Sequence, residues 1–314
     1  MLLGIDTSCY TTSLAAVERP GNLVADCRLL LSVEKGKRGM AQSEGFFHHV
    51  LQLPMLMEQL FSLLPKGPKS LSGVIVSTRP RPQEGSYMPV FRAGESMAKA
   101  ISQSLQLPLF ATSHQEGHIQ AALWSCGEEA ALGEEFLAVH LSGGTSEILR
   151  VQRQVAGFAI EILATADLAA GQLIDRVGVA LGLDFPAGPH LEKLAQTCPN
   201  PNLTIRSTVK AGQLFFSGPY TAAMRLLADG ADPAELAHTV LKTVAKALAK
   251  ALLYQMEATG LRKVLLAGGV MANRIIRESL LAALAPKAQL YFAKPAFSGD
   301  NAVGVAMLGL KMLS

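Results

Sequence analysis

Short apolar runs bounded by turn residues alternate with segments of helical periodicity along almost the whole chain. This alternation predicts an α/β fold, because buried strands and amphipathic helices leave these two patterns. Strands are expected at residues 2–5, 14–17, 24–31, 73–77, 107–111, 136–141, 147–151, 158–163, 264–267 and 290–292. Helices are expected at residues 43–63 (bent at Pro54), 93–105, 114–125, 167–181, 219–228, 233–259, 272–285 and 301–313.

One arrangement, a strand, a tight polar turn and a second strand, occurs twice. Residues 2–18 carry Thr7-Ser8 in the turn, and residues 136–152 carry Ser142-Gly143-Gly144-Thr145-Ser146. A hairpin used twice is expected of two duplicated α/β domains that hold a ligand in a cleft between them. Two unrelated hairpins would look the same, so the pattern leaves both interpretations open.

Composition narrows the class of protein. With 49% hydrophobic and only 17% charged residues the chain is not intrinsically disordered, and its 314 residues suit about two domains. So little charge predicts an apolar surface, and hence a partner protein or self-association. The formal net charge of +3 is no nucleic-acid footprint, so RNA binding would need a local basic patch.

Cysteine spacing and the absence of long apolar runs exclude further classes. The four cysteines lie far apart without a CxxC pair, which excludes a disulfide scaffold and a zinc finger. We find neither a secretory signal nor an apolar run of the roughly 18 residues that a membrane span needs. We therefore expect a cytoplasmic protein that has no membrane partner.

A histidine pair is the strongest local signal. Ser113 and Glu116 are spaced as a capping box, so a helix is expected to begin at residue 114. His114 and His118 then lie on one face of that helix, where both rings can reach one ion. Asp300, in the turn before the last helix, is either the N-cap of that helix or a third ligand suited to Fe, Zn or Mn. Without a third ligand, two surface histidines at chance spacing would explain the pair.

Two glycine-rich turns each follow an expected strand. One is Leu141-Ser142-Gly143-Gly144-Thr145, and the other spans residues 267–273 and ends at Asn273. Glycine allows close backbone approach and exposed N–H groups can hold a phosphate, but neither turn fits the dinucleotide or Walker pattern. Either turn alone reads as a plain connection, whereas two turns at matching places in both halves favour nucleotide binding.

Two further features are weaker. Asp175, on an expected helix, and the turn that contains Gly188 would suit a ribose. Residues 35–38 and 79–82 form basic clusters, and the first is either a solvated loop or a contact for RNA phosphate.

Several motifs, taken in order, give the chain a resemblance to a known family. They are Gly4-Ile5-Asp6-Thr7-Ser8-Cys9, the histidine pair, Ser142-Gly143-Gly144, Leu181-Gly182-Leu183-Asp184 with Pro186-Ala187-Gly188-Pro189, Phe216-Ser217-Gly218, Ala267-Gly268-Gly269-Val270 with Ala272-Asn273-Arg274, and Asp300-Asn301. The ordered set resembles the TsaD/Gcp family, the tRNA N6-adenosine threonylcarbamoyltransferases once described as O-sialoglycoprotein endopeptidases. The resemblance runs nearly from end to end, and its specificity lies in the order of the motifs.

The resemblance implies an actin/hexokinase-like (ASKHA) fold of two duplicated α/β lobes around a central nucleotide cleft, formed by residues 1–110 with 300–314 and by residues 111–299. It implies one divalent metal ion, Fe or Zn, on His114, His118 and Asp300. Substrate and nucleotide contacts are implied at Leu141, Ser142, Gly143, Gly144, Thr145, Asp175, Gly188 and Asn273. The implied reaction transfers a threonylcarbamoyl group from threonylcarbamoyl-AMP to N6 of adenosine 37 in tRNA. The implied partners are a TsaB-like or TsaD-like protein, or a second copy of the chain.

The chain departs from the family where acid–base chemistry is expected. Where the family pattern reads Thr-Ser-Cys-Asp-Glu-Thr, this chain has Tyr10 and Thr11 in place of the two acids. A phenol cannot replace a carboxylate base at neutral pH. Thr145 stands in place of a family histidine, and a Gly-Pro-Gly motif reads Arg79-Pro80-Arg81. The catalytic residue is therefore left unassigned.

Two hypotheses follow from these matches and departures. A working but divergent transferase explains why all three metal ligands are present. A non-catalytic relative that serves as a nucleotide- or metal-binding scaffold, or as the TsaB-like partner, explains the altered positions. A peptidase is disfavoured, because the histidine pair lacks the glutamate of an H-E-x-x-H motif.

Overall fold

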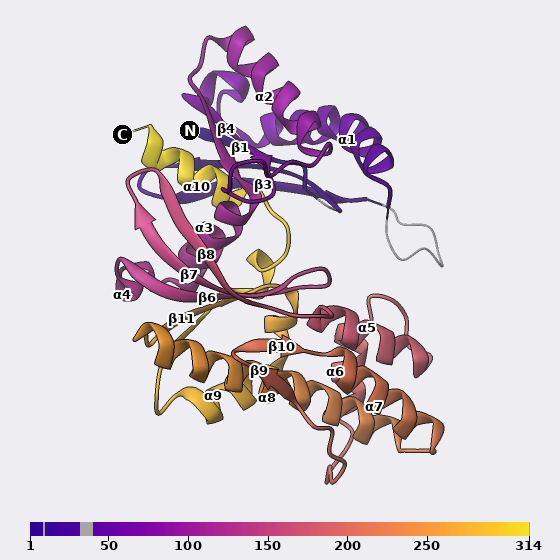
Figure 1. Ribbon diagram of the computed structural model, residues 1–314. Helices are drawn as coiled ribbons and strands as arrows, with labels where there is room; N and C mark the ends of the chain where they lie inside the picture. Colours follow the sequence, from indigo (N-terminus) through magenta and orange to yellow (C-terminus); the bar gives the residue numbers. More distant parts are fainter. Residues whose placement is uncertain (9, 32–39, 314) are drawn as a thin grey trace. The chain divides into compact units, whose positions relative to one another are not determined.

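The computed structural model describes residues 1–8, 10–31 and 40–313 (Figure 1), so the basic cluster at residues 35–38 lies outside the described residues. Contacts divide the chain into two compact units. The first comprises Met1–Gly127, Arg153–Ala159 and Gly299–Ser314, and the second Glu128–Gln152 and Ile160–Ser298. Residues 111–127, which we expected in the C-terminal lobe, thus group with the first unit, because the strand and helix that they contribute pack there.

The first unit is built on a five-stranded sheet. Its strands are β1 (Leu2–Asp6), β2 (Thr11–Glu18), β3 (Asn22–Leu30), β4 (Gly73–Arg79) and β5 (Leu109–Ser113), in the order β3-β2-β1-β4-β5. The central strand β1 pairs antiparallel with β2 and parallel with β4. The expected hairpin of residues 2–18 is therefore confirmed.

Helices cover both faces of this sheet. Leu3 and Ile5 of β1 pack into a core with α1 (Gln42–Leu63) and α2 (Phe91–Leu105). Gly4 points the opposite way, as strand alternation requires, toward α10 (Val303–Met312), which packs in turn on α3 (His114–Cys126). A Cβ on Gly4 would lie 2.7 Å from the carbonyl oxygen of Ala302, so this close helix–strand contact depends on glycine. A short 3₁₀ helix, η1 (Gly67–Ser70), precedes β4.

The second unit repeats the same strand arrangement. Its strands β6 (Glu135–Leu141), β7 (Ser146–Gln154), β8 (Gly157–Thr165), β11 (Lys263–Ala267) and β12 (Gln289–Phe292) follow the order β12-β11-β6-β7-β8. The central strand β6 pairs antiparallel with β7 and parallel with β11, as β1 does with β2 and β4. This equivalence confirms the duplication that the repeated hairpin suggested.

The core of the second unit is formed largely by the buried side chains of the long helix α8 (Pro233–Thr259). The remaining elements of this unit are α4 (Glu129–Leu132), α5 (Ala170–Ala180), α6 (Gly188–Ala195), α7 (Ser217–Ala228), α9 (Arg274–Leu284), the hairpin β9 (Thr208–Lys210) and β10 (Gln213–Phe215), and the 3₁₀ helices η2 (Gly269–Ala272) and η3 (Pro295–Phe297). Among them, α8 contacts α5, α6, α7, α9, β9 and β10. Every strand predicted from the sequence is present, whereas β9, β10, α4 and α6 were missed. Within the described residues, no helix is both long and apolar enough to cross a membrane.

Candidate metal centre and glycine-rich turns

The start of α3 is fixed by the capping box that the sequence predicts. The hydroxyl of Ser113 accepts a hydrogen bond from the backbone N–H of Glu116, and Oε2 of Glu116 accepts one from the backbone N–H of Ser113 at 3.0 Å. The other carboxylate oxygen of Glu116 accepts the N–H of Phe158 at 3.3 Å. The first turn of α3, which carries His114 and His118, is therefore anchored at both of its edges.

His114, His118 and Asp300 converge in the first unit. Nε2 of His118 lies 2.9 Å from Nε2 of His114 and 3.2 Å from Oδ1 of Asp300, and the remaining distance, His114 Nε2 to Asp300 Oδ1, is 3.6 Å. One ligand atom from each residue falls within 4.8 Å of the other two, so all three can reach one ion. His118 is 7% exposed, which excludes the alternative of two surface histidines at chance spacing.

A buried carboxylate, Asp6, orients the first of these ligands. Oδ1 of Asp6 lies 3.1 Å from Nδ1 of His114, and the hydroxyls of Ser8 and Ser77 donate to the same carboxylate. With Nδ1 bound to Asp6, Nε2 is the ring nitrogen that faces the other two ligands, as in carboxylate–histidine–metal arrangements. Sequence reasoning missed Asp6 as a site residue, although an acid directly after the apolar run at residues 2–5 is a visible signal.

Mutual attraction sets the charges of this group. Burial opposes ionisation of Asp6, yet the charge and hydrogen bond of His114, with the hydroxyls of Ser77 and Ser8, lower its pKa to about 2. Burial also opposes the charged form of His114, but Asp6 and Asp300 raise its pKa to about 9. For Asp300, burial is outweighed by the hydrogen bond from His118 and the charge of His114, so its pKa is lowered. The carboxylates of Asp6 and Asp300 thus favour a positive charge at the ring of His114.

Asp300 does not cap the last helix, so that alternative from the sequence is wrong. α10 begins at Val303, and the side-chain oxygen of Asn301 accepts the N–H of Val303 at 3.0 Å. Asn301 rather than Asp300 bonds this backbone N–H, and the carboxylate of Asp300 lies beside the two histidines. This arrangement favours the ligand interpretation.

The first glycine-rich turn closes the β6–β7 hairpin in the second unit. The N–H of Ser142 donates to the carbonyl of Thr145 at 2.8 Å, and the hydroxyl of Ser142 accepts the N–H of Thr145 at 3.0 Å. A Cβ added to Gly143 or Gly144 would meet no atom within 4 Å. The packing of the described chain therefore does not require glycine at these two positions, and their open space suits a ligand that approaches the backbone.

The second glycine-rich turn packs directly behind the end of β6. Gly268 has a φ of +98°, and a Cβ there would lie 2.1 Å from the carbonyl oxygen of Leu141. Gly171, in α5, lies close to the first glycine-rich turn. A Cβ added to Gly171 would lie 2.5 Å from the carbonyl oxygen of Ser142. Sequence reasoning missed Gly171, since a lone glycine within a helical pattern carries no such signal.

The other predicted contacts of the second unit are engaged in local structure. Asp175 is half-buried and accepts the N–H of Ala187 at 2.8 Å, so it supports the start of α6, whose first residue is Gly188. Burial raises the pKa of Asp175, although the backbone N–H groups of Ala187 and Gly188 act against it. Asn273 is the N-cap of α9, with its side-chain oxygen accepting the N–H of Ile276 at 3.0 Å.

The positions that depart from the family pattern are also placed by the structure. Tyr10 lies in the turn after β1 with 43% of its surface exposed, and the adjacent Thr11 is buried at the start of β2. Arg79 ends β4, and its Nε is buried without a hydrogen-bond partner among the described residues. Pro80 accepts the N–H of Gln115, so the segment that carries Arg79 and Arg81 is bound to the first turn of α3.

The duplicated sheets define the class of protein. Solved structures with this arrangement include the HypF protein of T. kodakarensis (TM-score 0.65, 15% identity, 99% of this chain and 48% of that one). Component A of the (R)-2-hydroxyglutaryl-CoA dehydratase of Acidaminococcus fermentans also matches (TM-score 0.60, 12% identity, 99% and 98%). At such low identity the likeness shows the fold alone, and this fold is the expected actin/hexokinase-like (ASKHA) α/β class.

Sequence comparison then gives the family. The family model described as tRNA N6-adenosine threonylcarbamoyltransferase (TsaD) matches residues 35–307. Relatives of that name include one from Thermus thermophilus, 32% identical over 311 residues (98% of this chain, 91% of the relative), and one from Geobacillus kaustophilus, 30% identical over 321 residues (98% and 90%). The chain belongs to the TsaD family.

Proposed function

We propose that the protein transfers a threonylcarbamoyl group from threonylcarbamoyl-AMP to N6 of adenosine 37 in tRNA. N6 attacks the carbamoyl carbon, the bond from that carbon to the AMP phosphate oxygen breaks, and N6 loses a proton while AMP leaves. The observation that carries the proposal is the convergence of His114, His118 and Asp300 in a chain whose relatives bear the name of this activity.

The first unit supplies the residues for one divalent ion, Fe or Zn. Two imidazoles and one carboxylate are donors that both metals accept, and their ligand atoms lie close enough to share one ion. Such an ion supplies Lewis acidity and a template for the adenylate. Asp6 holds the ring of His114 in the binding orientation, and burial of His118 limits access of bulk water to its ring.

The second unit supplies a backbone surface for the nucleotide. Gly143 and Gly144 leave open space beside the turn, and Gly269 does so after β11. Backbone N–H groups in such turns bind phosphate oxygens without steric obstruction from side chains. Asp175 fixes the start of α6, whose first residue is Gly188, and Asn273 fixes the start of α9. These three residues thereby shape the second unit's binding surface.

A partner protein is supported by an apolar surface on α1. Phe47, Leu51 and Met55 are spaced four residues apart and are 59%, 53% and 62% exposed. Residues at this spacing share one helix face, and a contiguous exposed apolar stripe is typical of an interaction site. We therefore propose a TsaB-like or TsaD-like protein, or a second copy of the chain, as the partner at α1.

A single-turnover assay tests the proposed function. The protein is mixed with threonylcarbamoyl-AMP, unmodified tRNA and the partner proteins of the family, and modified adenosine is measured. We expect product with the wild-type chain, and a loss of at least about 10³-fold in rate for His114→Ala, because removing a ligand removes the ion's contribution to the barrier. The matched control is His190→Ala, which removes an exposed histidine on α6.

The same assay separates the transferase from the scaffold. No product from the wild-type chain, with metal and nucleotide still bound by calorimetry, would contradict the transferase and leave a non-catalytic relative. Product that persists unchanged in His114→Ala would contradict the role of the metal group.

A further inference from the structure

The middle of α8 carries charge of one sign only. Between Glu235 and Glu257 its charged residues are Lys242, Lys246 and Lys250, each four positions from the next. Residues at this spacing share one helix face and rise about 6 Å apart along the axis, so the three lysines span about 12 Å. This row forms no charge run in the sequence, because apolar residues that become buried separate its lysines.

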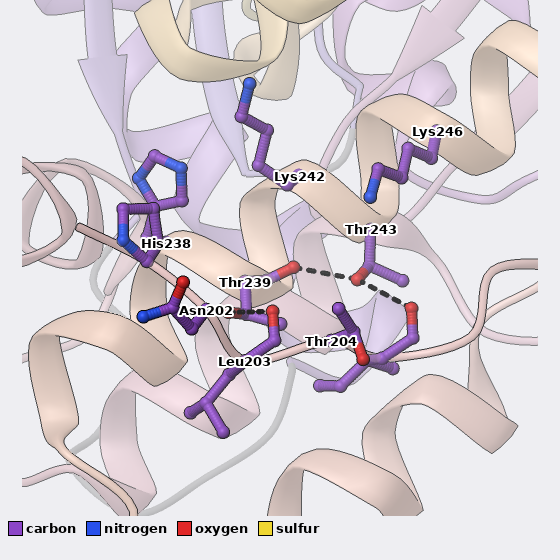
Figure 2. A pocket seen from close by; sticks show the side chains of 10 residues that line it. Asn202, Leu203, Thr204, His238, Thr239, Lys242, Thr243 and Lys246 are labelled. Carbon is purple, nitrogen blue, oxygen red and sulfur yellow. Dashed lines mark hydrogen bonds between the residues drawn. The ribbon is translucent and has the colours of Figure 1, made fainter.

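A pocket of about 240 Å³ lies beside the first two of these lysines, Lys242 and Lys246. Residues 201–205 form one wall and the α8 residues His238, Lys242 and Lys246 form the other (Figure 2). The hydroxyl of Thr239 donates to the carbonyl of Leu203 at 3.3 Å, and that of Thr243, which donates to the carbonyl of Thr239 at 2.7 Å, also lies 3.4 Å from the carbonyl of Ile205. Residues 201–205 are therefore held against α8.

The structure describes no acidic partner for these lysines. Lys246 and Lys250 are exposed and Lys242 is half-buried, and among the described residues none of the three forms an ion pair with a carboxylate. Nζ of Lys250 donates to the hydroxyl of Ser207 at 2.9 Å, and the exposed Arg206 adjoins that serine. Positive charge is thus concentrated here in a chain whose formal net charge is only +3.

An aromatic side chain extends the row. Tyr254 lies four residues after Lys250 and is 49% exposed. A Cβ on Gly212 would lie 2.5 Å from its ring, so the ring rests on the backbone of the β9–β10 turn. An exposed ring held in this way offers a surface on which a base can stack.

We propose that Lys242, Lys246, Lys250, Arg206 and Tyr254, here called the α8 lysine face, bind the phosphate backbone of RNA. A row of unpaired cations complements a row of phosphates better than it complements one compact anion, and the aromatic ring at its end suits a nucleobase. The inference rests on the proposed function for its RNA, which is the tRNA substrate. It assigns a binding role to residues of the second unit, whereas the metal ligands belong to the first unit.

Fluorescence anisotropy with labelled, unmodified tRNA tests the assignment. The variant is Lys242→Gln with Lys246→Gln and Lys250→Gln, which keeps helix-forming side chains of similar length. The matched control, Lys66→Gln with Lys69→Gln and Lys287→Gln, removes the same charge from exposed positions elsewhere. Circular dichroism of both variants verifies that they are folded.

We expect the α8 variant to bind tRNA on the order of 100-fold more weakly at about 0.1 M salt, and its slope of log affinity against log salt to fall by about 2 to 3. Tyr254→Leu is expected to weaken binding about tenfold, while Tyr254→Phe retains it. The control variant is expected to match the wild type. Equal affinity and equal slope for the α8 variant would overturn the proposal.

Two further measurements distinguish an RNA site from a site for acidic polypeptide, and failure of this assignment from failure of the proposed function. If labelled poly-glutamate binds as tightly as tRNA and is lost in the same variant, the face is a site for acidic polypeptide and the RNA assignment is overturned. His114→Ala is expected to bind tRNA as the wild type does. If tRNA binding depends on the three lysines but the wild type transfers no group, the α8 assignment stands and the proposed function fails.

Discussion

The two units share one strand order, but their central hairpins end in different chemistry. In the first unit β1 ends at Asp6, a buried carboxylate bonded to His114. In the second unit β6 ends at Leu141, a buried apolar residue, and a turn with two unobstructed glycines follows. The same backbone frame thus provides charge for a metal group in one unit and open backbone for a ligand in the other.

Different forces therefore hold the two strand ends. The first relies on hydrogen bonds to a buried charge, with Ser8, Ser77 and His114 as donors. The second relies on close backbone packing, in which Gly268 and Gly171 leave no room for a Cβ. Substitutions at one strand end should accordingly change charge-dependent properties, and those at the other should change packing.

The largest effect is expected from Gly268→Ala in the second unit. The new Cβ would meet the carbonyl of Leu141 at 2.1 Å on a backbone with positive φ, so we expect a loss of about 3 kcal/mol or more in the free energy of unfolding. Urea denaturation measures it. The control, Gly269→Ala, enters open space and should change the free energy by less than about 0.5 kcal/mol. Equal effects at both positions would break the packing account.

The next effect concerns Asp6→Asn in the first unit. The amide keeps the shape of the side chain but removes the charge that orients His114, so metal affinity should fall about 10- to 100-fold. Calorimetric titration with Zn²⁺ measures the affinity. In the second unit Asp175→Asn should leave it unchanged, because that carboxylate bonds the start of α6. If Asp6→Asn binds Zn²⁺ as tightly as the wild type does, the orientation of His114 does not depend on the charge of Asp6.

A pH dependence is expected from His49, which is fully buried in the first unit. The Thr12 hydroxyl donates to Gln52, so it accepts from Nδ1 of His49, whose Nε2 has no partner among the described residues. Burial is the main cause that lowers the pKa of His49 to about 4; His48 adds to it, and the charges of Asp6 and Asp300 oppose it.

The sign follows from this lowered pKa. The unfolded chain takes up a proton near pH 6.5 while the folded chain does not until about pH 4, so the contribution of His49 is complete above pH 6.5 and is lost as the pH falls toward 4. We expect wild type to lose on the order of 2 kcal/mol more than His49→Gln between these pH values, measured by urea denaturation. Parallel pH profiles of the two proteins would contradict the prediction.

The smallest effect is expected at Tyr10, where the family has an acid. Its side chain is 43% exposed in the turn after β1, so we expect Tyr10→Phe to change the single-turnover transfer rate by less than about twofold. A loss of tenfold or more would assign the hydroxyl a direct role in the reaction and would sharpen the contrast between the two hairpin turns.

The fold was predictable where the pattern is long and regular. The predicted strands are all present because each has an apolar run bounded by turn residues, whereas the three-residue strands β9 and β10 are too short to leave a pattern. The helix α6 was missed because Gly188-Pro189 reads as a turn, although proline is well accommodated at a first helical turn.

Only those site residues that lie close together in the sequence could be predicted from their spacing. His114 and His118 follow from their separation, and Asp300 was an open alternative until the fold brought it to them. Asp6 and Gly171 act through partners far away in the sequence, and the lysines of α8 form a row only once the helix exists. Such roles depend on tertiary contacts, which no spacing rule contains.

The most direct measurement is transfer by protein from which metal has been removed. After treatment with a chelator and its removal, single-turnover product is measured with no metal and after addition of Fe²⁺ or Zn²⁺. We predict no product without metal and recovery with at least one of the two ions in the wild-type chain, but no recovery in His118→Ala. Transfer at an undiminished rate after metal removal would contradict the account that His114, His118 and Asp300 serve this reaction through an ion.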